Sequence, residues 1–461
     1  MQFKDNICLN TDSYKASHFL QYPDGTETVF SYIESRGGKY DKTLFFGLQM
    51  FLKEYLSKPV TMGQVWDAKK FFDAHGEPFN LEGWTKLLRK HNGRLPLRIR
   101  AVPEGTVLPV KNALVTVENT DPEFFWLTSY IETALLRAVW YPTTVATQSW
   151  YIKQTIKKAL EETGDVSGLA FKLHDFGARG VSSFESAAIG GSAHLVNFMG
   201  SDTVSGVLAL SEFYDAPVSG FSIPAAEHST TTILGREGEV KQYERMLEKF
   251  AKPGSLVAIV SDGYDIYNAC RNIWGGVLKQ KVIDSGATVI IRPDSGHPAT
   301  VVLKCLELLK ESFGAVKNDK GFYVLNNVRV IQGDGINQDS ITEIINTFTN
   351  AGFSADNVAF GMGGALLQQI NRDTQKFAMK ACAAQINGEW IDVYKEPITD
   401  AGKVSKKGRL TTVTNEISEW STERVEVVNE EFHVDRMRTV WLNGELLIND
   451  NLDIIRERSN K

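Results

Sequence analysis

The central part of the chain alternates short apolar runs with amphipathic stretches. Between Phe171 and Phe360, runs of β-branched residues repeatedly precede a polar turn, and a stretch with helical periodicity follows each turn. The apolar runs end near Ser261, Arg292, Gln332 and Phe360. These ends are about 30 to 40 residues apart, the spacing expected of parallel strands joined by helical crossovers. The pattern predicts an α/β domain and is compatible with a barrel or a doubly wound sheet.

Three stretches show this pattern most clearly. LVAIVSDG precedes a helix expected around Asp265–Lys279, TVIIRPDSG one at Ala299–Ser312, and VRVIQGDG one at Asp339–Ala351. NVAFGMGG begins a further strand and helix.

The two flanks of this region have a different pattern. Leu95–Asn119 alternates β-prone residues with turn signals, and similar short runs occur from Ala381 onward. Because such runs lie on both sides of the βα region, we expect a second, β-rich domain built from both chain ends. We place its N-terminal part, with helices, at 1–150, the α/β domain at 151–385 and the returning segment at 386–461.

Composition narrows the class of protein. With 461 residues, 43% hydrophobic and 23% charged, the chain can bury a large core, and its net charge of −6 gives no general attraction to nucleic acid or anionic membranes. The four cysteines are far apart and form no CxxC motif, which favours a reducing compartment. No uninterrupted apolar run reaches the roughly 18 residues of a membrane span, so we expect a cytoplasmic protein.

Polar residues recur where the predicted strands end. His174-Asp175, Ser261-Asp262, Arg292-Pro293-Asp294, Gly333-Asp334 and the Gly361-Met362-Gly363-Gly364 turn all occupy such positions. Each alone is typical of a helix cap or a tight turn. Their recurrence at strand ends, where parallel βα folds bind ligands, predicts a functional site.

Several of these residues suit phosphate. The FGMGG turn could bring backbone amides close to a phosphate, and Arg292 and Arg372 could pair with one, although surface ion pairs are the ordinary role of such arginines. There is neither a Walker loop nor a GxGxxG fingerprint.

His228 is preceded by Glu227 and followed by hydroxyl residues. A lone histidine beside an acid is more often structural than catalytic, and no HExxH or similar spacing indicates zinc. Any metal is better explained as magnesium held by Asp262 or Asp294 together with substrate phosphates.

Taken together and in order, several motifs resemble the nicotinamide phosphoribosyltransferase family. They are NTDSYK at Asn10–Lys15, KLHDFGARGVSS at Lys172–Ser183, NFMGSDTVSG at Asn197–Gly206, PAAEHST at Pro224–Thr230, RPDSG, QGDG and SKKGRL, with WLTSYIET and TVENTDPE in the N-terminal third. The resemblance implies a type II phosphoribosyltransferase: an irregular parallel α/β barrel with a β-rich domain, assembled as a homodimer with active sites at the subunit interface. The substrates would be nicotinamide and phosphoribosyl pyrophosphate, with Mg²⁺ as cofactor and ATP as co-substrate.

The resemblance also implies roles for residues at the pyridine ring. Phe176 and, from the partner subunit, Tyr14 would stack on the two faces of the ring. Asp202 would accept a hydrogen bond from the carboxamide, whereas the carboxylate of nicotinate would meet like charge there. Asp202 therefore argues against a nicotinate or quinolinate phosphoribosyltransferase, which shares the fold. Without the resemblance, the ordinary role of Asp202 is that of a turn residue.

The remaining implied contacts concern the ribose and phosphates. Arg179 and Arg292 would lie at the ring and ribose-phosphate pocket, and Asp294 would contact ribose hydroxyls or magnesium. The ribose 5-phosphate would lie against Gly333, Asp334, Gly363 and Gly364, further phosphates against Arg372 and Lys380, and the pyrophosphate against Arg36 and Lys39 of the second subunit.

His228 resembles the histidine that becomes phosphorylated in members of this family, which couples ATP hydrolysis to synthesis. Glu227 and Asp262 would then be the partners of its other ring nitrogen and of the metal. The chain departs from the family pattern at Ala258, where a serine is common, at Met362 and Ala365 around the glycine pair, and at Gly37-Gly38 in a stretch that is usually more basic. A non-catalytic signalling protein on the same scaffold is the alternative from another class.

Overall fold

The computed structural model describes residues 5–399 and 403–461, and its contacts divide the chain into two compact units. The first unit contains the N-terminal part as far as Thr147, the short segment Glu212–Ala216, and Asn371–Lys461. The second contains Gln148–Ser211 and Pro217–Ile370. The expected β-rich part formed from both chain ends is therefore confirmed.

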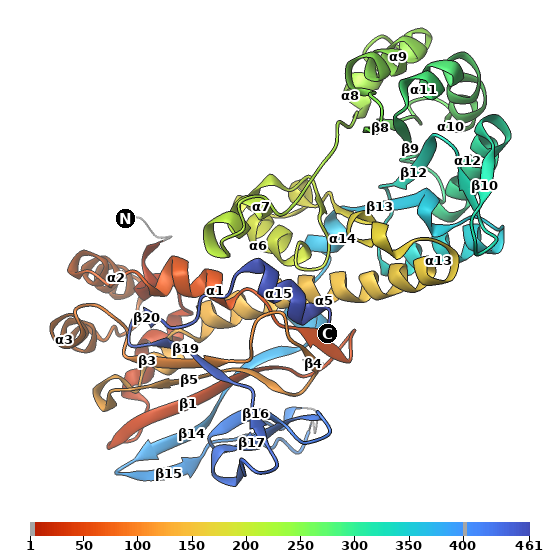
Figure 1. Ribbon diagram of the computed structural model, residues 1–461. Coiled ribbons are helices and arrows are strands. Elements are labelled where there is room, and N and C mark those ends of the chain that lie inside the picture. Colours follow the sequence, from red (N-terminus) through yellow and green to blue (C-terminus); the bar gives the residue numbers. More distant parts are fainter. Residues whose placement is uncertain (1–4, 400–402) are drawn as a thin grey trace. The chain divides into compact units, whose positions relative to one another are not determined.

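An antiparallel sheet of seven strands dominates the first unit, in the order β15-β14-β1-β5-β3-β19-β20. Strand β1 pairs with β14 on one side and β5 on the other, so residues near both ends of the chain share one sheet (Figure 1). The strands are β1 (Thr26–Ser35), β3 (Leu97–Ala101), β5 (Ala113–Asn119), β14 (Phe377–Ile386), β15 (Glu389–Asp392), β19 (Arg438–Leu442) and β20 (Glu445–Leu446).

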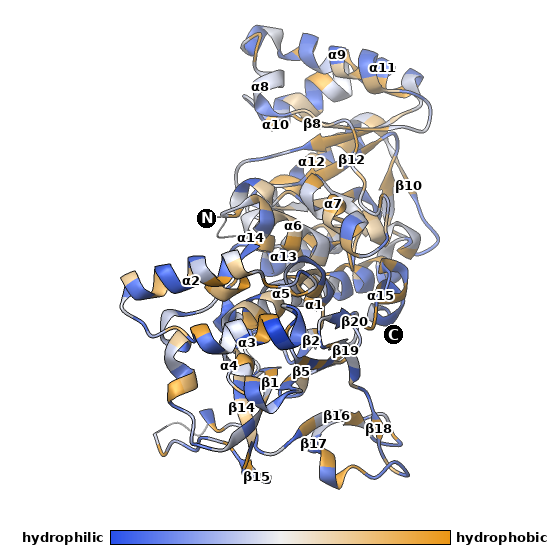
Figure 2. Cartoon of the chain, turned by 90° about the vertical axis from the view of Figure 1, so that its left-hand side faces the viewer, coloured by the Kyte–Doolittle hydropathy of each residue, from blue (hydrophilic) through white to orange (hydrophobic). Residues whose placement is uncertain are grey.

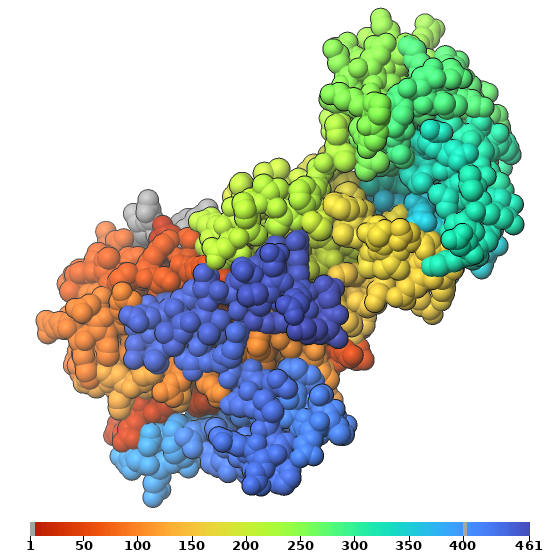
Figure 3. All heavy atoms as spheres, viewed as in Figure 1, coloured from red at the N-terminus to blue at the C-terminus, as the bar shows by residue number. Residues whose placement is uncertain are grey.

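Two smaller sheets and a set of helices complete this unit. In the space-filling view, atoms from the N-terminal part and from the C-terminal part adjoin on its surface (Figure 3). The strands are β2 (Lys42–Leu44), β4 (Val107–Pro109), β16 (Leu410–Thr414), β17 (Trp420–Arg424) and β18 (Val434–Asp435). The helices are α1 (Leu48–Phe51), α2 (Met62–His75), α3 (Leu81–His91), α4 (Leu127–Tyr130), the first half of α5 (Glu132–Thr163) and α15 (Leu452–Ser459).

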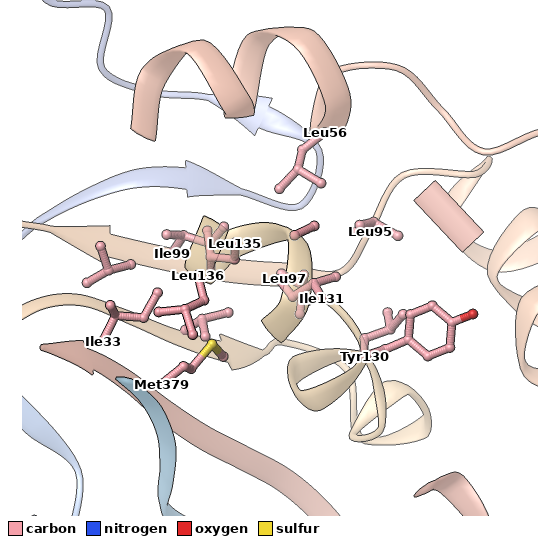
Figure 4. Packing of buried hydrophobic residues seen from close by; sticks show 14 of the residues in the cluster. Ile33, Leu56, Leu95, Leu97, Ile99, Tyr130, Ile131, Leu135, Leu136 and Met379 are labelled. Carbon is pink, nitrogen blue, oxygen red and sulfur yellow. The ribbon is translucent and has the colours of Figure 1, made fainter. Parts of the chain in front are cut away.

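The core of the first unit forms where α5 packs on the seven-stranded sheet. Leu135 and Leu136 of the helix lie against Ile99 and Met379 of the strands (Figure 4). These side chains are at most 9% exposed, as expected for a helix that presents one apolar stripe to a sheet.

A parallel sheet of six strands forms the second unit, in the order β7-β6-β13-β12-β9-β8. Each strand ends close to the residue at which its apolar run ends. The apolar residues form the buried strand, and the polar residues that follow form the turn. The strands are β6 (Leu173–Asp175), β7 (Gly200–Ser201), β8 (Leu256–Val260), β9 (Thr288–Arg292), β12 (Val328–Gln332) and β13 (Val358–Met362), with a separate hairpin of β10 (Ala315–Lys317) and β11 (Tyr323–Leu325).

One extended segment joins the two edges of this parallel sheet. Phe221 forms a parallel bridge with Gly200 of β7, and Ala225 forms one with Ala258 of β8. The Phe221 N–H donates to Met199 at 2.7 Å, and the Ala226 N–H donates to Ala258 at 2.9 Å. The segment thus connects first and last strands, which gives the expected irregular α/β barrel rather than an open doubly wound sheet.

Helices cover the parallel sheet, and α9 shows both hydrophilic and hydrophobic stretches (Figure 2). They are α6 (Phe184–His194), α7 (Val204–Phe213), α8 (His228–Thr231), α9 (Glu239–Phe250), α10 (Ile266–Asn268), α11 (Lys279–Ser285), α12 (Pro298–Phe313), α13 (Gln338–Asn350) and α14 (Gly364–Leu367). The helix expected around Asp265–Lys279 is interrupted, because Ala269–Val277 between α10 and α11 is π-helical. No helix in the described ranges has the length and apolar character to cross a membrane.

Candidate active site

A histidine and two aspartates meet at the carboxyl ends of β8 and β9. His228 begins α8, and its Nε2 lies 2.9 Å from Asp262 Oδ1, while its Nδ1 lies 3.9 Å from Asp294 Oδ2. Asp262 Oδ2 accepts hydrogen bonds from the Asp294 N–H at 3.0 Å and the Ser295 hydroxyl at 2.6 Å. The Asp262 side chain is 3% exposed and that of His228 is 45% exposed, so a buried carboxylate orients an accessible imidazole.

Arg292 joins this cluster from the end of β9. Its Nη2 donates to Asp294 Oδ2 at 3.0 Å, and its guanidinium carbon lies 6.0 Å from the centre of the Phe176 ring. Its Nε is buried and, within the part of the chain that the structure describes, has no hydrogen-bond partner. A buried donor without a partner is costly and is commonly satisfied by a ligand or an ordered water.

The Phe176 ring lies on glycine backbone. A Cβ on Gly361 of β13 would come within 1.9 Å of the ring, and one on Gly333 within 3.5 Å. The Phe176 N–H donates to the Met362 carbonyl at 2.9 Å, which fixes the start of its loop. Gly361 is therefore required for this ring position. The sequence signal is the FGMGG stretch, whose glycines predict a turn close to a phosphate but not a contact with the Phe176 ring.

Asp202 follows β7 and has an exposed side chain. Its Oδ1 accepts a hydrogen bond from Ser222, in the segment that joins the barrel edges. Asp202 also lines an open pocket of about 480 Å³ whose other lining residues come from the loop after Phe176 and from the starts of α6 and α7. The strand-end cluster of His228 and Asp262 does not line this pocket.

Glu227 does not meet its expected partner. Its Oε1 accepts a hydrogen bond from Ser229, and the ring nitrogens of His228 face Asp262 and Asp294. The sequence placed Glu227 and His228 together because they are adjacent in the chain, but α8 begins at His228 and directs the two side chains differently.

The predicted phosphate-binding loops also lie at strand ends. Gly333 and Asp334 follow β12, and Asp334 is exposed; its carbonyl accepts a hydrogen bond from Gln332 Nε2 at 2.9 Å. Gly363 and Gly364 form the start of the short helix α14, and a Cβ on Gly364 would meet nothing within 4 Å. Arg179 is exposed in the turn Ala178–Gly180.

Five predicted residues belong to the first unit. Tyr14 is 55% exposed, Lys39 is exposed, and the exposed Arg372 side chain approaches Asp373 at 3.5 Å. Arg36 Nε donates to Glu34 at 3.2 Å. Lys380 lies in β14 opposite Tyr32 of β1, and burial lowers its pKa.

The structure explains why residue 38 is a glycine, which the sequence alone did not. The Arg36 and Lys39 N–H groups bond to Lys376 and Thr374, which draws their loop onto the neighbouring chain. A Cβ on Gly38 would lie 2.2 Å from the Thr374 carbonyl oxygen. The glycine that replaces a basic residue thus permits this close approach.

Buried titratable groups flank the Phe176 loop. Burial raises the pKa of Asp175 to about 6, and burial lowers the pKa of His174. Neither was among the predicted site residues, although both were noted at a strand end.

Asp262 and Asp294 are the carboxylates that could hold a magnesium ion together with substrate phosphates. In residues 5–399 and 403–461, no group of three or more histidine, cysteine, aspartate or glutamate side chains forms a metal cage. Mg²⁺ is usually bound by one or two carboxylates together with phosphates and waters, and Asp262 and Asp294 supply such a pair.

The chain resembles known proteins over its full length. A model of the nicotinate phosphoribosyltransferase (NAPRTase) family matches residues 171–445, and one of the N-terminal domain of nicotinamide phosphoribosyltransferase matches residues 6–99. A nicotinamide phosphoribosyltransferase from Xanthomonas campestris pv. campestris is 57% identical, covering 99% of this chain and 98% of the relative. One from Acinetobacter baylyi is 32% identical, with coverage of 99% and 98%.

Solved structures support the same fold. The nicotinate-nucleotide pyrophosphorylase of Pyrococcus furiosus has a TM-score of 0.64 at 16% identity, covering 100% of this chain and 96% of that chain. Human nicotinic acid phosphoribosyltransferase has a TM-score of 0.55 at 16% identity, with coverage of 98% and 92%. Both the barrel and the antiparallel sheet thus match the type II phosphoribosyltransferase fold, and the chain belongs to the nicotinate phosphoribosyltransferase family and, within it, to the nicotinamide phosphoribosyltransferases.

Proposed function

We propose that this protein is a pentosyltransferase that transfers the phosphoribosyl group of phosphoribosyl pyrophosphate to nicotinamide, producing nicotinamide mononucleotide for NAD salvage. The observation that carries the choice of base is Asp202, an exposed carboxylate at a barrel strand end, on the rim of an open pocket. An ionised carboxylate accepts hydrogen bonds and cannot donate them. It pairs with the NH₂ of nicotinamide and repels the carboxylate of nicotinate.

The transfer requires no protein nucleophile. The pyridine nitrogen forms a bond to C1 of the ribose as the bond from C1 to the pyrophosphate oxygen breaks, and the electron pair of that bond leaves with pyrophosphate. The nitrogen becomes a pyridinium and no proton is lost. The work of the protein is to align the ring and stabilise charge on the leaving group.

Phe176 and Arg292 are suited to the base and ribose end of this reaction. The Phe176 ring, fixed on Gly361, offers an apolar face for offset stacking. The Arg292 Nε, which has no partner among residues 5–399 and 403–461, offers a donor to the substrate, while its Nη2 stays paired with Asp294. Phosphates would be bound by the Gly333-Asp334 and Gly363-Gly364 loops and by Arg179, all within the second unit.

Asp262 and Asp294 would hold Mg²⁺ together with the substrate phosphates. When bound, the ion neutralises charge that develops on pyrophosphate. The Asp294 N–H and the Ser295 hydroxyl both donate to Asp262, so its carboxylate is fixed before any ion arrives.

We further propose that ATP phosphorylates His228. Asp262 contacts Nε2 of the imidazole, and Asp294 lies farther from Nδ1, so Nδ1 is the nitrogen better placed to accept a phosphoryl group. A phosphoryl group there would add negative charge beside the proposed magnesium site. Glu227 precedes α8 and would act by holding the Ser229 hydroxyl at the start of this helix rather than through contact with the ring.

A homodimer is proposed to complete the site, with Tyr14, Arg36 and Lys39 contributed by the second subunit. Apolar side chains beside the Asp202 pocket are unusually exposed, with Phe184 at 76% and Val204 at 68%. Exposed apolar patches of this kind commonly mark protein contacts. We place the protein in the cytoplasm, where its free cysteines would stay reduced.

The test is product formation measured by mass spectrometry with Mg²⁺ and phosphoribosyl pyrophosphate, offering nicotinamide and nicotinate separately. We expect nicotinamide mononucleotide as the main product. A preference for nicotinate, or turnover with neither base, would overturn the proposal. Light scattering of the same preparation tests the dimer.

A further inference from the structure

Asp175 is a buried carboxyl that the proposed reaction does not use. It is the last residue of β6, and its side chain is 0% exposed. Because side chains alternate along a strand, it points to the face opposite that of His174 and Phe176. There it packs against α6, where a Cβ on Gly191 would lie 3.2 Å from Asp175 Oδ2. The carboxyl is thus out of reach of a ligand that contacts the Phe176 ring.

Asp175 binds the two loops that carry the predicted base contacts. Its Oδ1 accepts the Gly177 N–H at 2.7 Å, which closes a turn around Phe176. Its backbone carbonyl accepts the Asp202 N–H at 3.0 Å. One residue therefore fixes the loop of the stacking ring through its side chain and the loop of the amide acceptor through its backbone.

The environment of Asp175 is costly for a carboxyl. Its Oδ2 is buried and, among the described residues, makes no hydrogen bond of good geometry. Burial, with a smaller contribution from the charge of Asp202, raises the pKa of Asp175 to about 6, although the Gly177 N–H and the nearby Thr203 hydroxyl act in the opposite direction. An apolar residue of similar size would avoid the burial of a carboxyl but would leave the Gly177 N–H without its acceptor, so the carboxyl is tied to the conformation of this turn.

We propose that Asp175 is a positioning residue that sets the distance between the Phe176 ring and the Asp202 carboxylate, and thereby the fit of the pyridine base. The proposal rests on the function proposed above. Asp175 does not touch substrate; it acts through Gly177 and the Asp202 backbone. Its loss should therefore weaken use of the base more than use of phosphoribosyl pyrophosphate.

The test compares Asp175→Ala with Asp175→Asn in steady-state kinetics of the full-length protein. Alanine removes the acceptor for Gly177, and we expect the KM for nicotinamide to rise about tenfold while the KM for phosphoribosyl pyrophosphate stays within about twofold. Asparagine retains an acceptor oxygen, so it should restore the KM for nicotinamide to within about twofold of wild type. An unchanged KM for nicotinamide, equal rises for both substrates, or no rescue by asparagine would each overturn the proposal.

A matched control comes from the segment that precedes β6. Asp165 Oδ1 accepts the N–H of Ser167, two residues further along the chain, at 2.8 Å. This is the same kind of contact that Asp175 makes with Gly177. Asp165→Ala should leave both KM values unchanged. If Asp175→Ala does not fold, Asp175→Leu, which has a similar size and no acceptor, takes its place with the same expected results.

Failure of the proposed function gives a different result. If wild-type protein makes no nicotinamide mononucleotide, the function is wrong, and hydrogen exchange then tests the positioning alone. Asp175→Ala should speed exchange of the Gly177 amide about tenfold, whereas Asp175→Asn should not. Equal exchange in all three proteins would overturn the positioning role.

Discussion

His228 Nε2 lies 2.9 Å from Asp262 Oδ1, and the same carboxylate accepts the Asp294 N–H through its other oxygen. One buried aspartate thus orients both the imidazole proposed to carry phosphate and the loop proposed to hold magnesium. The accessible imidazole and the buried carboxylate come from different βα units, so only the family resemblance, which implied Asp262 as a partner of His228, indicated this pairing from the sequence.

The first prediction concerns ATP coupling. His228→Ala should abolish the stimulation of nicotinamide mononucleotide synthesis by ATP and leave slow ATP-independent turnover, because the transfer itself needs no protein nucleophile. His297→Ala is the control, since His297 is exposed and lies 3.5 Å from Glu343. The measurement is the rate of nicotinamide mononucleotide synthesis with and without ATP. If ATP still stimulates synthesis by His228→Ala, a phosphohistidine at this position is excluded.

The second prediction concerns the support of the stacking ring. In Gly361→Ala the new Cβ would lie 1.9 Å from Phe176 Cε2, so the ring must move. Displacement of a positioning group by about 1 Å can cost on the order of 10²-fold in rate, and we expect such a loss of kcat/KM for nicotinamide. Gly276→Ala, whose Cβ would meet nothing closer than 3.8 Å, should retain wild-type kinetics. Comparable kinetics in both variants would show that Phe176 does not contact the base.

The third prediction concerns pH and stability. The pKa of Asp175 is raised from 3.8 to about 6, so the folded state favours the protonated carboxyl. Its contribution to stability is fully present below about pH 4 and is lost as pH rises through about 6. Asp175→Asn does not titrate, so its stability relative to wild type should increase over this window by up to about 3 kcal/mol. Urea unfolding at pH 4 and pH 8 measures the change, and a pH-independent difference would contradict it.

The fourth prediction concerns the core of the first unit. Leu97 in β3 is 0% exposed within that core, and Leu97→Ala should lower the free energy of unfolding by about 2–5 kcal/mol. Leu20→Ala, at a side chain 65% exposed, should change it by less than about 0.5 kcal/mol. If both substitutions lowered the free energy of unfolding equally, Leu97 would not belong to the core of the first unit.

Much of the barrel could be predicted because each parallel strand is a buried apolar run followed by a polar turn. The ends expected at Arg292 and Gln332 are the observed ends of β9 and β12. The strand pattern did not predict closure, which only the family resemblance implied, since the segment Phe221–Ala226 bridges both edges through single residues and has no strand pattern. The expected boundary after residue 385 differs from the observed division at Ile370, because β14 resembles another buried run yet pairs with β1.

The site was predictable where a residue type carries its own chemistry. His228, Asp262, Arg292 and Asp294 were identified from the sequence, and the structure brings them together. Gly361, Ser222 and Asp175 were missed as site residues because their importance depends on which strand or loop lies beside them.

The proposed role of Asp202 is to select nicotinamide over nicotinate. A comparison of kcat/KM for the two bases in wild type and Asp202→Asn tests this role most directly. We expect wild type to prefer nicotinamide strongly, and Asp202→Asn to lose kcat/KM for nicotinamide about tenfold or more while its ratio of kcat/KM for nicotinamide over nicotinate falls. Unchanged discrimination in Asp202→Asn, or a wild-type preference for nicotinate, would contradict this role.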